Sequence, residues 1–204
     1  MGEGVRAAFG LAGGLALFLF GMESMSRALQ QAAGERLRGF LRRITRTPLT
    51  GALAGLLVTA VLQSSSATIA VLQRAAQQAG PDGIHSVLGL AGALPILLGD
   101  NIGTTITAVL AAVGQPTDAR RTAAAHCCFN LSGSVVCLLA LPWMTRLVEA
   151  VSPKGPELEV LARQIANAHT LFNLGCTVLW LPLTPCMVRI VCTLLPEKHA
   201  PELK

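Results

Sequence analysis

The sequence contains few charged and few aromatic residues. Of its 204 residues, 13% are charged and 4% are aromatic, and tyrosine is absent. Soluble domains carry about 25% charged residues, so this deficit argues against a large soluble core. With 52% hydrophobic residues and a mean hydropathy of +0.56, the composition indicates an integral membrane protein. The scarcity of aromatic side chains also leaves no strong aromatic belt to mark the membrane interfaces.

The chain also lacks the usual signatures of enzymes and of disulfide or zinc frameworks. It contains no Walker loop and no visible set of nucleophile, base and acid, so enzymatic functions rank low. Its six cysteines fall in or beside apolar segments without a CxxC pair. We interpret them as small packing residues rather than metal ligands. We therefore expect neither catalysis nor a cofactor.

Arginine supplies most of the net charge of +5, and its densest run lies at residues 36–46. Such a run is compatible with a nucleic-acid surface. Because it follows an apolar span, we interpret it as a cytoplasmic loop or an interfacial helix, and we expect no nucleic-acid partner.

The apolar segments predict an all-α, multi-pass membrane protein with one transmembrane domain over residues 1–204. The first span has no clear cleavage site after it, and we expect it to be retained. The predicted segments are a first span at 7–29, a basic amphipathic segment at 30–48, an interrupted segment at 49–79, a second interrupted segment at 84–113, and spans at 122–144 and 164–195.

The positive charges divide unequally between the two sides that this arrangement predicts. One side holds Arg27, Arg36, Arg38, Arg42, Arg43, Arg46, Arg74, Arg146, Lys154 and Arg163. The other holds Arg6, Arg120, Arg121, Arg189, Lys198 and Lys204. The excess favours the first side as cytoplasmic, but its small size leaves insertion in both orientations open.

Residues 63–68, with the sequence QSSSAT, carry several hydrogen-bonding side chains and lie between two apolar segments. The apolar arm before them, 49–62, is about 21 Å long as a helix, short of the roughly 30 Å of hydrocarbon. A turn at 63–66 would send the second arm, 67–79, back to the same side as a re-entrant helical hairpin. One continuous helix over 49–79 with a polar stripe is the alternative.

A second polar stretch, GDNIGTTIT at residues 99–107, lies inside the apolar segment 84–113. Two half-length apolar pieces around a break rich in glycine and threonine predict a discontinuous helix whose backbone groups meet ions or substrate. A kinked but continuous helix is the alternative. Asp100 is the one acid in this stretch. Buried alone it would be costly, so we expect a proton or a cation to neutralise it, unless it merely caps the following half-helix.

Two short motifs in the chain are similar: AHCCFN at residues 125–130 and AHTLFN at residues 168–173. In each copy the histidine and the asparagine are four residues apart and share one helix face. We interpret these pairs as hydrogen-bonded stripes between packed helices, with direct contact to an ion or substrate as the alternative. The residues are His126, Asn130, His169 and Asn173.

The polar stretches suit ion binding. Hydroxyl, amide and backbone carbonyl oxygens are hard ligands for Na⁺, and helix N-termini attract oxyanions. One pair of such stretches can therefore host a cation and an anion without a buried arginine.

Several motifs resemble one repeat of the sodium-dependent phosphate cotransporter family, which has bacterial members and animal type II members. They are QSSSAT at 63–68, PILLGDNIGTT at 95–105, the ARR, AH and FN pieces within 119–130, and LFLFGM at 17–22. The likeness covers about residues 11–185. The pairing of QSSSAT with NIGTT is far more specific than either motif alone.

The resemblance implies inverted repeats, each with a re-entrant hairpin and a broken helix, that meet at a central site. It implies that hairpin-tip residues bind Na⁺ and phosphate and that the broken helix completes the site. The residues so implied are Gln63, Ser64, Ser65, Ser66 and Thr68 at the tip, and Asn101, Thr104 and Thr105 in the broken helix, with Asp100 beside them. We place sodium at Gln63, Ser65, Asn101 and Thr104.

Two departures from the family pattern shape the functional expectation. Family members usually carry two repeats, and this chain has one, so either two copies assemble in opposite orientation or the chain is half of a longer or split transporter. Asp100 stands where the family commonly has a small neutral residue. We expect a sodium-coupled inorganic phosphate symporter in the inner (plasma) membrane, working as a homodimer of antiparallel protomers. The alternatives are a non-transporting half or assembly subunit, and a transporter or channel for another anion.

Overall fold

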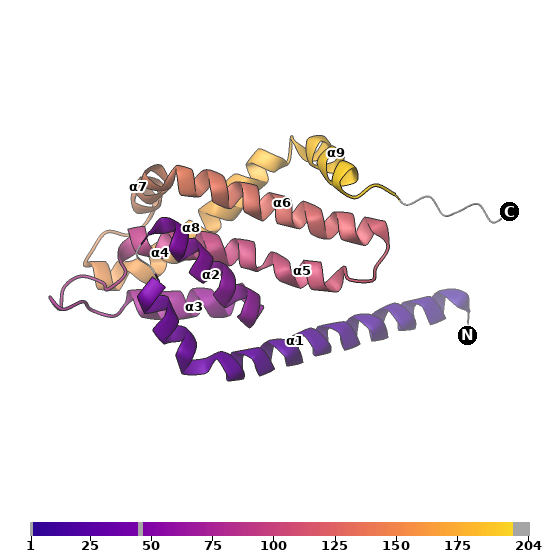
Figure 1. The fold of residues 1–204 in the computed structure, drawn as a ribbon, viewed down its shortest axis with the longest axis horizontal. Coiled ribbons are helices and arrows are strands. Elements are labelled where there is room, and N and C mark those ends of the chain that lie inside the picture. The colour runs from indigo at the N-terminus through magenta and orange to yellow at the C-terminus, as the bar shows by residue number, and fades with distance from the viewer. Residues whose placement is uncertain (1, 45–46, 198–204) are drawn as a thin grey trace.

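The computed structural model describes residues 2–44 and 47–197, and over these ranges the chain folds into helices without a strand (Figure 1). This confirms the all-α class. The helices are α1 (Glu3–Ile44), α2 (Pro48–Leu62), α3 (Ser65–Ala76), α4 (Gly89–Gly103), α5 (Thr105–Ala111), α6 (Thr117–Leu139), α7 (Leu141–Val151), α8 (Glu157–Trp180) and α9 (Thr184–Leu194).

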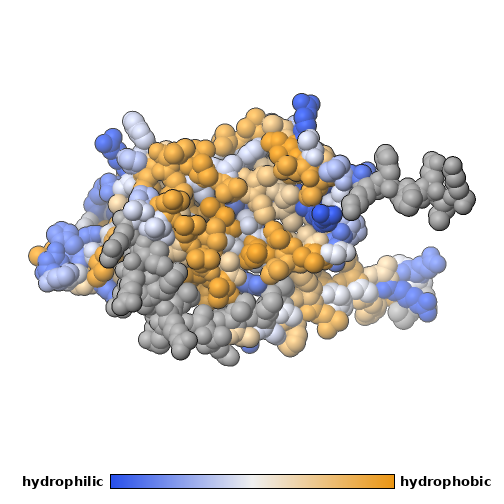
Figure 2. Space-filling model, in the orientation of Figure 1, coloured by the Kyte–Doolittle hydropathy of each residue, from blue (hydrophilic) through white to orange (hydrophobic). Residues whose placement is uncertain are grey.

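Within residues 2–44 and 47–197, three helical stretches are long and apolar enough to cross a membrane: Glu3–Gly21, Gly89–Ala111 and Thr117–Leu139. The pair α8 and α9, which is bent by 85°, adds a fourth if it is counted as one span. Figure 2 shows hydrophobic side chains gathered across the middle of the visible face and hydrophilic ones at its left end, which holds α7 and the α3–α4 loop in Figure 1. This distribution is that of a membrane protein.

Several element boundaries differ from the predicted segments. Helix α1 runs without interruption through residues 7–29 and most of the predicted basic segment 30–48, whose arginine side chains lie outside the described part of the structure. The span predicted at 122–144 is divided into α6 and α7 at Ala140, and the one predicted at 164–195 begins earlier, at Glu157, and is divided near Pro182.

Helix α2 ends where the polar motif begins, and the chain then turns back. Gln63 has a left-handed backbone conformation, with φ of 51°, and Ser64 caps the start of α3 by accepting a hydrogen bond from the Ala67 amide. The hydroxyls of Thr59 in α2 and Thr68 in α3 lie 3.0 Å apart. In one continuous helix these nine positions would span about 13 Å, so the continuous alternative over 49–79 is wrong. The structure contains no membrane, and entry of this pair from one side remains a prediction.

The second polar stretch is not unwound, which corrects the predicted discontinuous helix over 84–113. Residues 84–88 precede α4, and the polar residues Gly99–Gly103 are its last turns. Only Thr104 separates α4 from α5, and its amide still donates to the Asp100 carbonyl, at 2.9 Å. The structure therefore agrees with the alternative of a kinked, nearly continuous helix.

The glycines of this stretch serve helix packing instead of a break. A Cβ atom at Gly99 would lie 1.8 Å from the Ala52 carbonyl oxygen, and one at Gly103 would lie 2.6 Å from that of Leu56. From the other side, a Cβ at Gly55 would lie 1.9 Å from the Ile96 carbonyl oxygen. Helices α2 and α4 therefore meet backbone against backbone, as small residues allow in membrane proteins.

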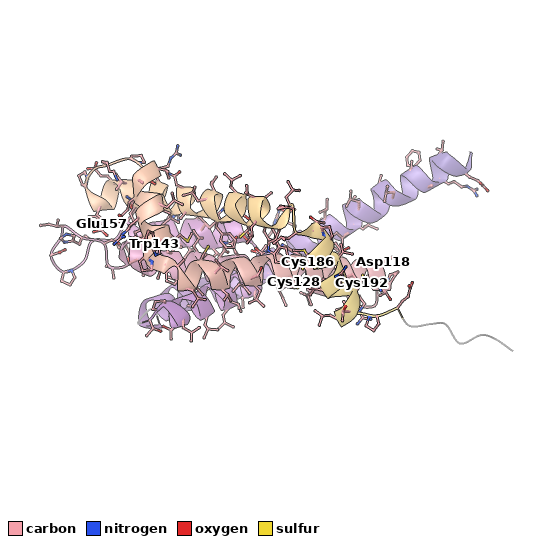
Figure 3. All side chains as sticks on the ribbon, turned by 90° about the horizontal axis from the view of Figure 1, so that it is seen from above. Asp118, Cys128, Trp143, Glu157, Cys186 and Cys192 are labelled. Atoms are coloured by element: carbon pink, nitrogen blue, oxygen red, sulfur yellow. The ribbon has the colours of Figure 1, made fainter. Side chains whose placement is uncertain are left out.

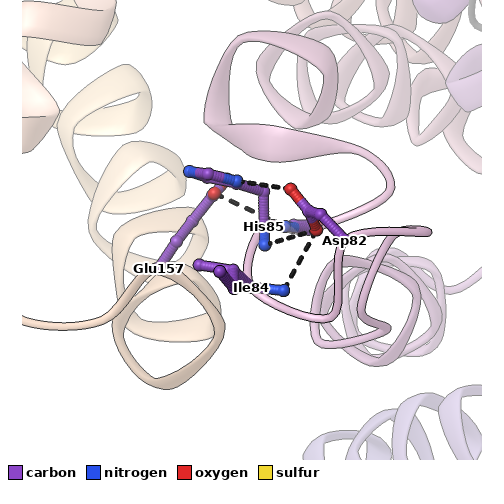
Figure 4. A network of polar contacts seen from close by, with 5 residues as sticks. Asp82, Ile84, His85 and Glu157 are labelled. Atoms are coloured by element: carbon purple, nitrogen blue, oxygen red, sulfur yellow. Dashed lines mark hydrogen bonds and ion pairs between the residues drawn. The ribbon is translucent and has the colours of Figure 1, made fainter.

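The loop between α3 and α4 is held together by Asp82 (Figure 4). One oxygen of its carboxylate accepts the amides of Ile84 and His85, both at 3.0 Å, and the other lies 2.6 Å from Nδ1 of His85. The Ser86 amide donates to the Glu157 carboxylate at the start of α8, at 3.4 Å. The loop thus joins the C-terminal end of α3 to the start of α8.

The pair of Asp82 and His85 gives the loop a defined pH dependence. The hydrogen bond to Asp82, together with its negative charge, raises the pKa of His85 above the ordinary value of 6.5. The contribution of His85 to the stability of the folded protein is fully present below about pH 6.5, and it is lost as the pH rises through the raised pKa. The His85 side chain first, and then the His85 and Ile84 amides, lower the pKa of Asp82 to about 2. The contribution of Asp82 to the stability of the folded protein is present above about pH 4, and it is lost as the pH falls through about 2.

We predict that an NMR titration of the His85 ring has its midpoint above pH 6.5, and that Asp82→Asn moves the midpoint down toward it. A His85 midpoint that Asp82→Asn leaves unchanged would contradict the ion pair.

Candidate functional site

The two polar motifs meet at the start of α3 and the junction of α4 and α5. The hydroxyl oxygens of Ser65 and Thr104 lie 2.5 Å apart, although 39 positions separate them in the chain. Thr104 also donates to the Asp100 carbonyl, at 2.9 Å, so Ser65 is then the donor of the shared hydrogen bond. Both side chains are half-buried. The structure therefore brings together one residue from each predicted part of the site.

Behind this contact lies a buried carboxylate. Asp100 is fully buried, and its Oδ1 accepts a hydrogen bond from the Thr59 hydroxyl at 2.6 Å. Thr59 in turn lies against Thr68, and both threonines are buried. The second carboxylate oxygen, Oδ2, has no hydrogen-bond partner among the described residues. Asp100 lies within α4, and no side chain caps α5, so the interpretation of Asp100 as a cap of the following half-helix is wrong.

An isolated buried carboxylate is costly, and a neutralising ion or proton removes most of the cost. Oδ2 of Asp100 and Oε1 of Gln63 are both buried without a partner. Carboxylate, amide and hydroxyl oxygens are the hard donors that alkali cations prefer. This part of the fold therefore supplies buried oxygen atoms whose hydrogen-bonding capacity the described residues leave unused.

The remaining predicted residues are bonded mainly to their own helices. The Asn101 amide donates to the Leu97 carbonyl at 2.9 Å, and the Thr105 hydroxyl donates to that of Ile102 at 2.8 Å. Ser64 caps α3, while Ser66 is exposed. The N-terminus of α3 thus places three serines at the positive end of a helix dipole, which favours an oxyanion.

The two similar histidine and asparagine pairs lie on different helices, one on α6 and the other on α8. Asn130 donates to the His126 carbonyl at 3.1 Å, and Asn173 donates to the His169 carbonyl at 2.9 Å. Neither asparagine is hydrogen-bonded to Ser65, Asp100 or Thr104 in the described part of the chain. The structure places these residues beside the site helices without bringing them into the site.

Two residues that the sequence analysis did not select support the site. Thr59 donates to Asp100, and the Ser134 hydroxyl in α6 donates to the Leu98 carbonyl at 2.9 Å, which ties α6 to α4. The only local signal for Thr59 is a hydroxyl within an apolar arm, one turn before Gln63. Ser134 carries no comparable signal.

We predict that Thr59→Val destabilises the folded protein, because it leaves the Asp100 carboxylate without a hydrogen-bond donor. The expected loss is about 1–3 kcal/mol in the free energy of unfolding, measured by reversible denaturation in detergent. Thr177→Val is the matched control, because Thr177 is exposed and its hydroxyl donates to the Asn173 carbonyl of its own helix. The control should change stability by less than about 0.5 kcal/mol. Equal effects of the two substitutions would contradict a special role for the Thr59–Asp100 bond.

Comparison with known proteins places these features in a family context. The sequence profile described as Na⁺/Pi-cotransporter matches residues 17–152, two thirds of the chain. The sodium-dependent phosphate transport protein 2A of Rattus norvegicus is 32% identical over 148 residues, which cover 69% of this chain and 22% of that protein. The human sodium-dependent phosphate transport protein 2B is 31% identical over 158 residues, covering 74% of this chain and 22% of that protein.

A bacterial relative is similar over a shorter stretch. The uncharacterized protein YqeW of Bacillus subtilis is 40% identical over 101 residues, which cover 50% of this chain and 31% of that protein. The chain thus spans between about a fifth and a third of the length of these relatives. No solved structure matches the chain.

Proposed function

The chain belongs to the Na⁺/Pi-cotransporter family, a family of transporters and not of enzymes, and we propose that it moves inorganic phosphate across the membrane together with Na⁺. The observation that carries the proposal is the contact between Ser65 and Thr104, with the buried Asp100 directly behind it. This contact joins the two family motifs at one place in the fold. The named relatives that are described as sodium-dependent phosphate transport proteins support the choice of ions.

Sodium binds, in this proposal, among side-chain oxygens of the two motifs. Gln63, Ser65, Asn101 and Thr104 are the proposed ligands, and Asp100 supplies the negative charge. The unpartnered oxygens of Gln63 and Asp100 support this assignment because a cation gives them the partner that the protein does not.

Phosphate binds at the N-terminus of α3. Ser64, Ser65 and Ser66 present hydroxyl and amide donors there, and the buried residues Thr68 and Thr105 add polar groups behind them. The positive end of the α3 dipole supports an oxyanion at this position. A sodium ion bound nearby offsets the repulsion between phosphate and Asp100, which couples the two ligands.

A second copy of the repeat completes the site. The chain spans 22% of the two animal relatives and holds one QSSSAT and one NIGTT motif, which support a half-site. We propose a homodimer of antiparallel protomers in the inner (plasma) membrane, in which α2 and α3 form a re-entrant hairpin in each copy. Transport then alternates access by moving the paired cores against the remaining helices.

A non-transporting assembly subunit is the second candidate, and the single repeat favours it. Such a subunit would bind a partner repeat and need not couple ions by itself. Another anion is the third candidate, and the charge of Asp100 in the site favours it over a strict phosphate carrier.

We predict that proteoliposomes containing this chain alone take up phosphate when a Na⁺ gradient is imposed. Ser65→Ala and Asn101→Ala should weaken Na⁺ binding roughly tenfold, about 1.4 kcal/mol, seen as a smaller Na⁺-dependent rise in Tm. Ser24→Ala, an exposed position in α1, is the control and should keep the full response.

Each outcome of this experiment separates the candidates. Uptake that ignores Na⁺ removes the coupling, and variants with a full Na⁺ response show that the site is misplaced. Stabilisation by Na⁺ or phosphate without uptake favours the assembly subunit. A larger stabilisation by sulfate or an organic anion than by phosphate favours the third candidate.

A further inference from the structure

An apolar groove lies between α6, α7 and α8, apart from the ion site. Its volume is about 300 Å³, at the lower end of the range for ligand pockets. Its walls include Val136 from α6, Trp143 and Leu147 from α7, and Phe172, Gly175 and Leu179 from α8. The groove is open at the apolar surface of the protein, because its wall residues Val136 and Leu147 are 54% and 52% exposed. Its contents are therefore in contact with the lipid phase.

Helix α7 brings a polar group to one end of this groove. It has 11 residues, about 16 Å in length, too short to cross a bilayer. Met144 and Val148 on one face are buried, while Trp143 is 72% exposed at the mouth of the groove. The Arg146 guanidinium lies 5.6 Å from the centre of the Trp143 ring. An amphipathic helix with an exposed tryptophan and arginine is typical of the membrane interface.

The groove lies toward the end of the molecule that holds the loop between α7 and α8. In Figure 3, Trp143 lies toward the same end as Glu157, and Asp118, Cys186 and Cys192 lie toward the other. Among the described residues, Arg146, Lys154 and Arg163 form no ion pair with a carboxylate. The distribution of positive charge along the sequence favours this end as cytoplasmic, and the cytoplasmic leaflet carries anionic lipids.

We propose that the groove binds one acyl chain of an anionic phospholipid, whose phosphate contacts the Arg146 guanidinium. A volume of about 300 Å³ argues against a helix as the occupant, because one turn of an α-helix with its side chains is about 10–12 Å across and about 5.4 Å long. A thin, flexible hydrocarbon chain fits a groove of about 300 Å³. The lone arginine at the mouth complements an anionic headgroup, and its stacking on Trp143 holds it at the interface. The proposal does not depend on which ion the protein transports.

Native mass spectrometry of the full chain in mild detergent tests the proposal with two lipids of identical acyl chains. Dioleoyl phosphatidylglycerol should be retained with higher affinity than dioleoyl phosphatidylcholine. Arg146→Gln should weaken phosphatidylglycerol binding about fivefold, the effect of one interfacial charge. Arg163→Gln removes another exposed charge that forms no ion pair with a described carboxylate and does not line the groove, and it should leave the affinity within about twofold.

A second pair of variants tests the apolar part of the site. Gly175→Leu fills the groove, and it should preserve the fold because a Cβ at Gly175 meets nothing within 4 Å. It should abolish retention of both lipids. Ala91→Leu adds a similar side chain at an exposed position of α4 and should have no effect.

Three results would overturn the proposal. They are normal lipid retention by Gly175→Leu, an unchanged preference for phosphatidylglycerol in Arg146→Gln, and a lipid-free dimer that Gly175→Leu dissociates. The last result would assign the groove to a second copy of the chain.

Discussion

The backbone contact between α2 and α4 determines the rest of this structure. Gly55 on one helix and Gly99 and Gly103 on the other leave no space for a side chain between the two backbones. Because the helices approach so closely, Thr59 reaches Asp100, and the chain reversal at Gln63 brings Ser65 to Thr104. In lipid, where no hydrophobic effect drives helices together, close packing of this kind is the main attraction between them.

The same contact creates a cost that an ion can remove. Asp100 and Gln63 each keep one buried oxygen without a partner, in a place where the surrounding helices are apolar. Asp100 lies in α4 beside buried apolar residues such as Leu97 and Leu98, and a buried polar atom without a partner is costly. We therefore regard the unmet hydrogen-bonding capacity as the physical basis of the ion binding that we propose, and not as a defect of the fold.

The sequence allowed the location of the candidate site to be predicted, but not its construction. Hydroxyl and amide side chains at 63–68 and 99–107 stand out because their flanks are apolar, and the structure joins the two stretches through Ser65 and Thr104. A glycine that interrupts a helix looks the same in sequence as one that admits a neighbouring helix. The choice at Gly99 depends on the position of the Ala52 carbonyl, which is set by tertiary packing. Thr59 was not predicted for a similar reason, because its role is to donate a hydrogen bond to Asp100, which is 41 residues away in the sequence.

The central claim is that glycine packing of α2 against α4 holds the two motifs in contact. Disulfide formation in membranes between Ser65→Cys and Thr104→Cys tests it most directly, with the cross-linked peptide identified by mass spectrometry among the native cysteines. The two hydroxyls lie 2.5 Å apart, within the reach of a disulfide. The account predicts rapid cross-linking that Gly99→Ala suppresses and that Gly92→Ala, on the same helix but facing only the Leu88 side chain, does not. Absence of the cross-link, or equal cross-linking in both glycine variants, would contradict it.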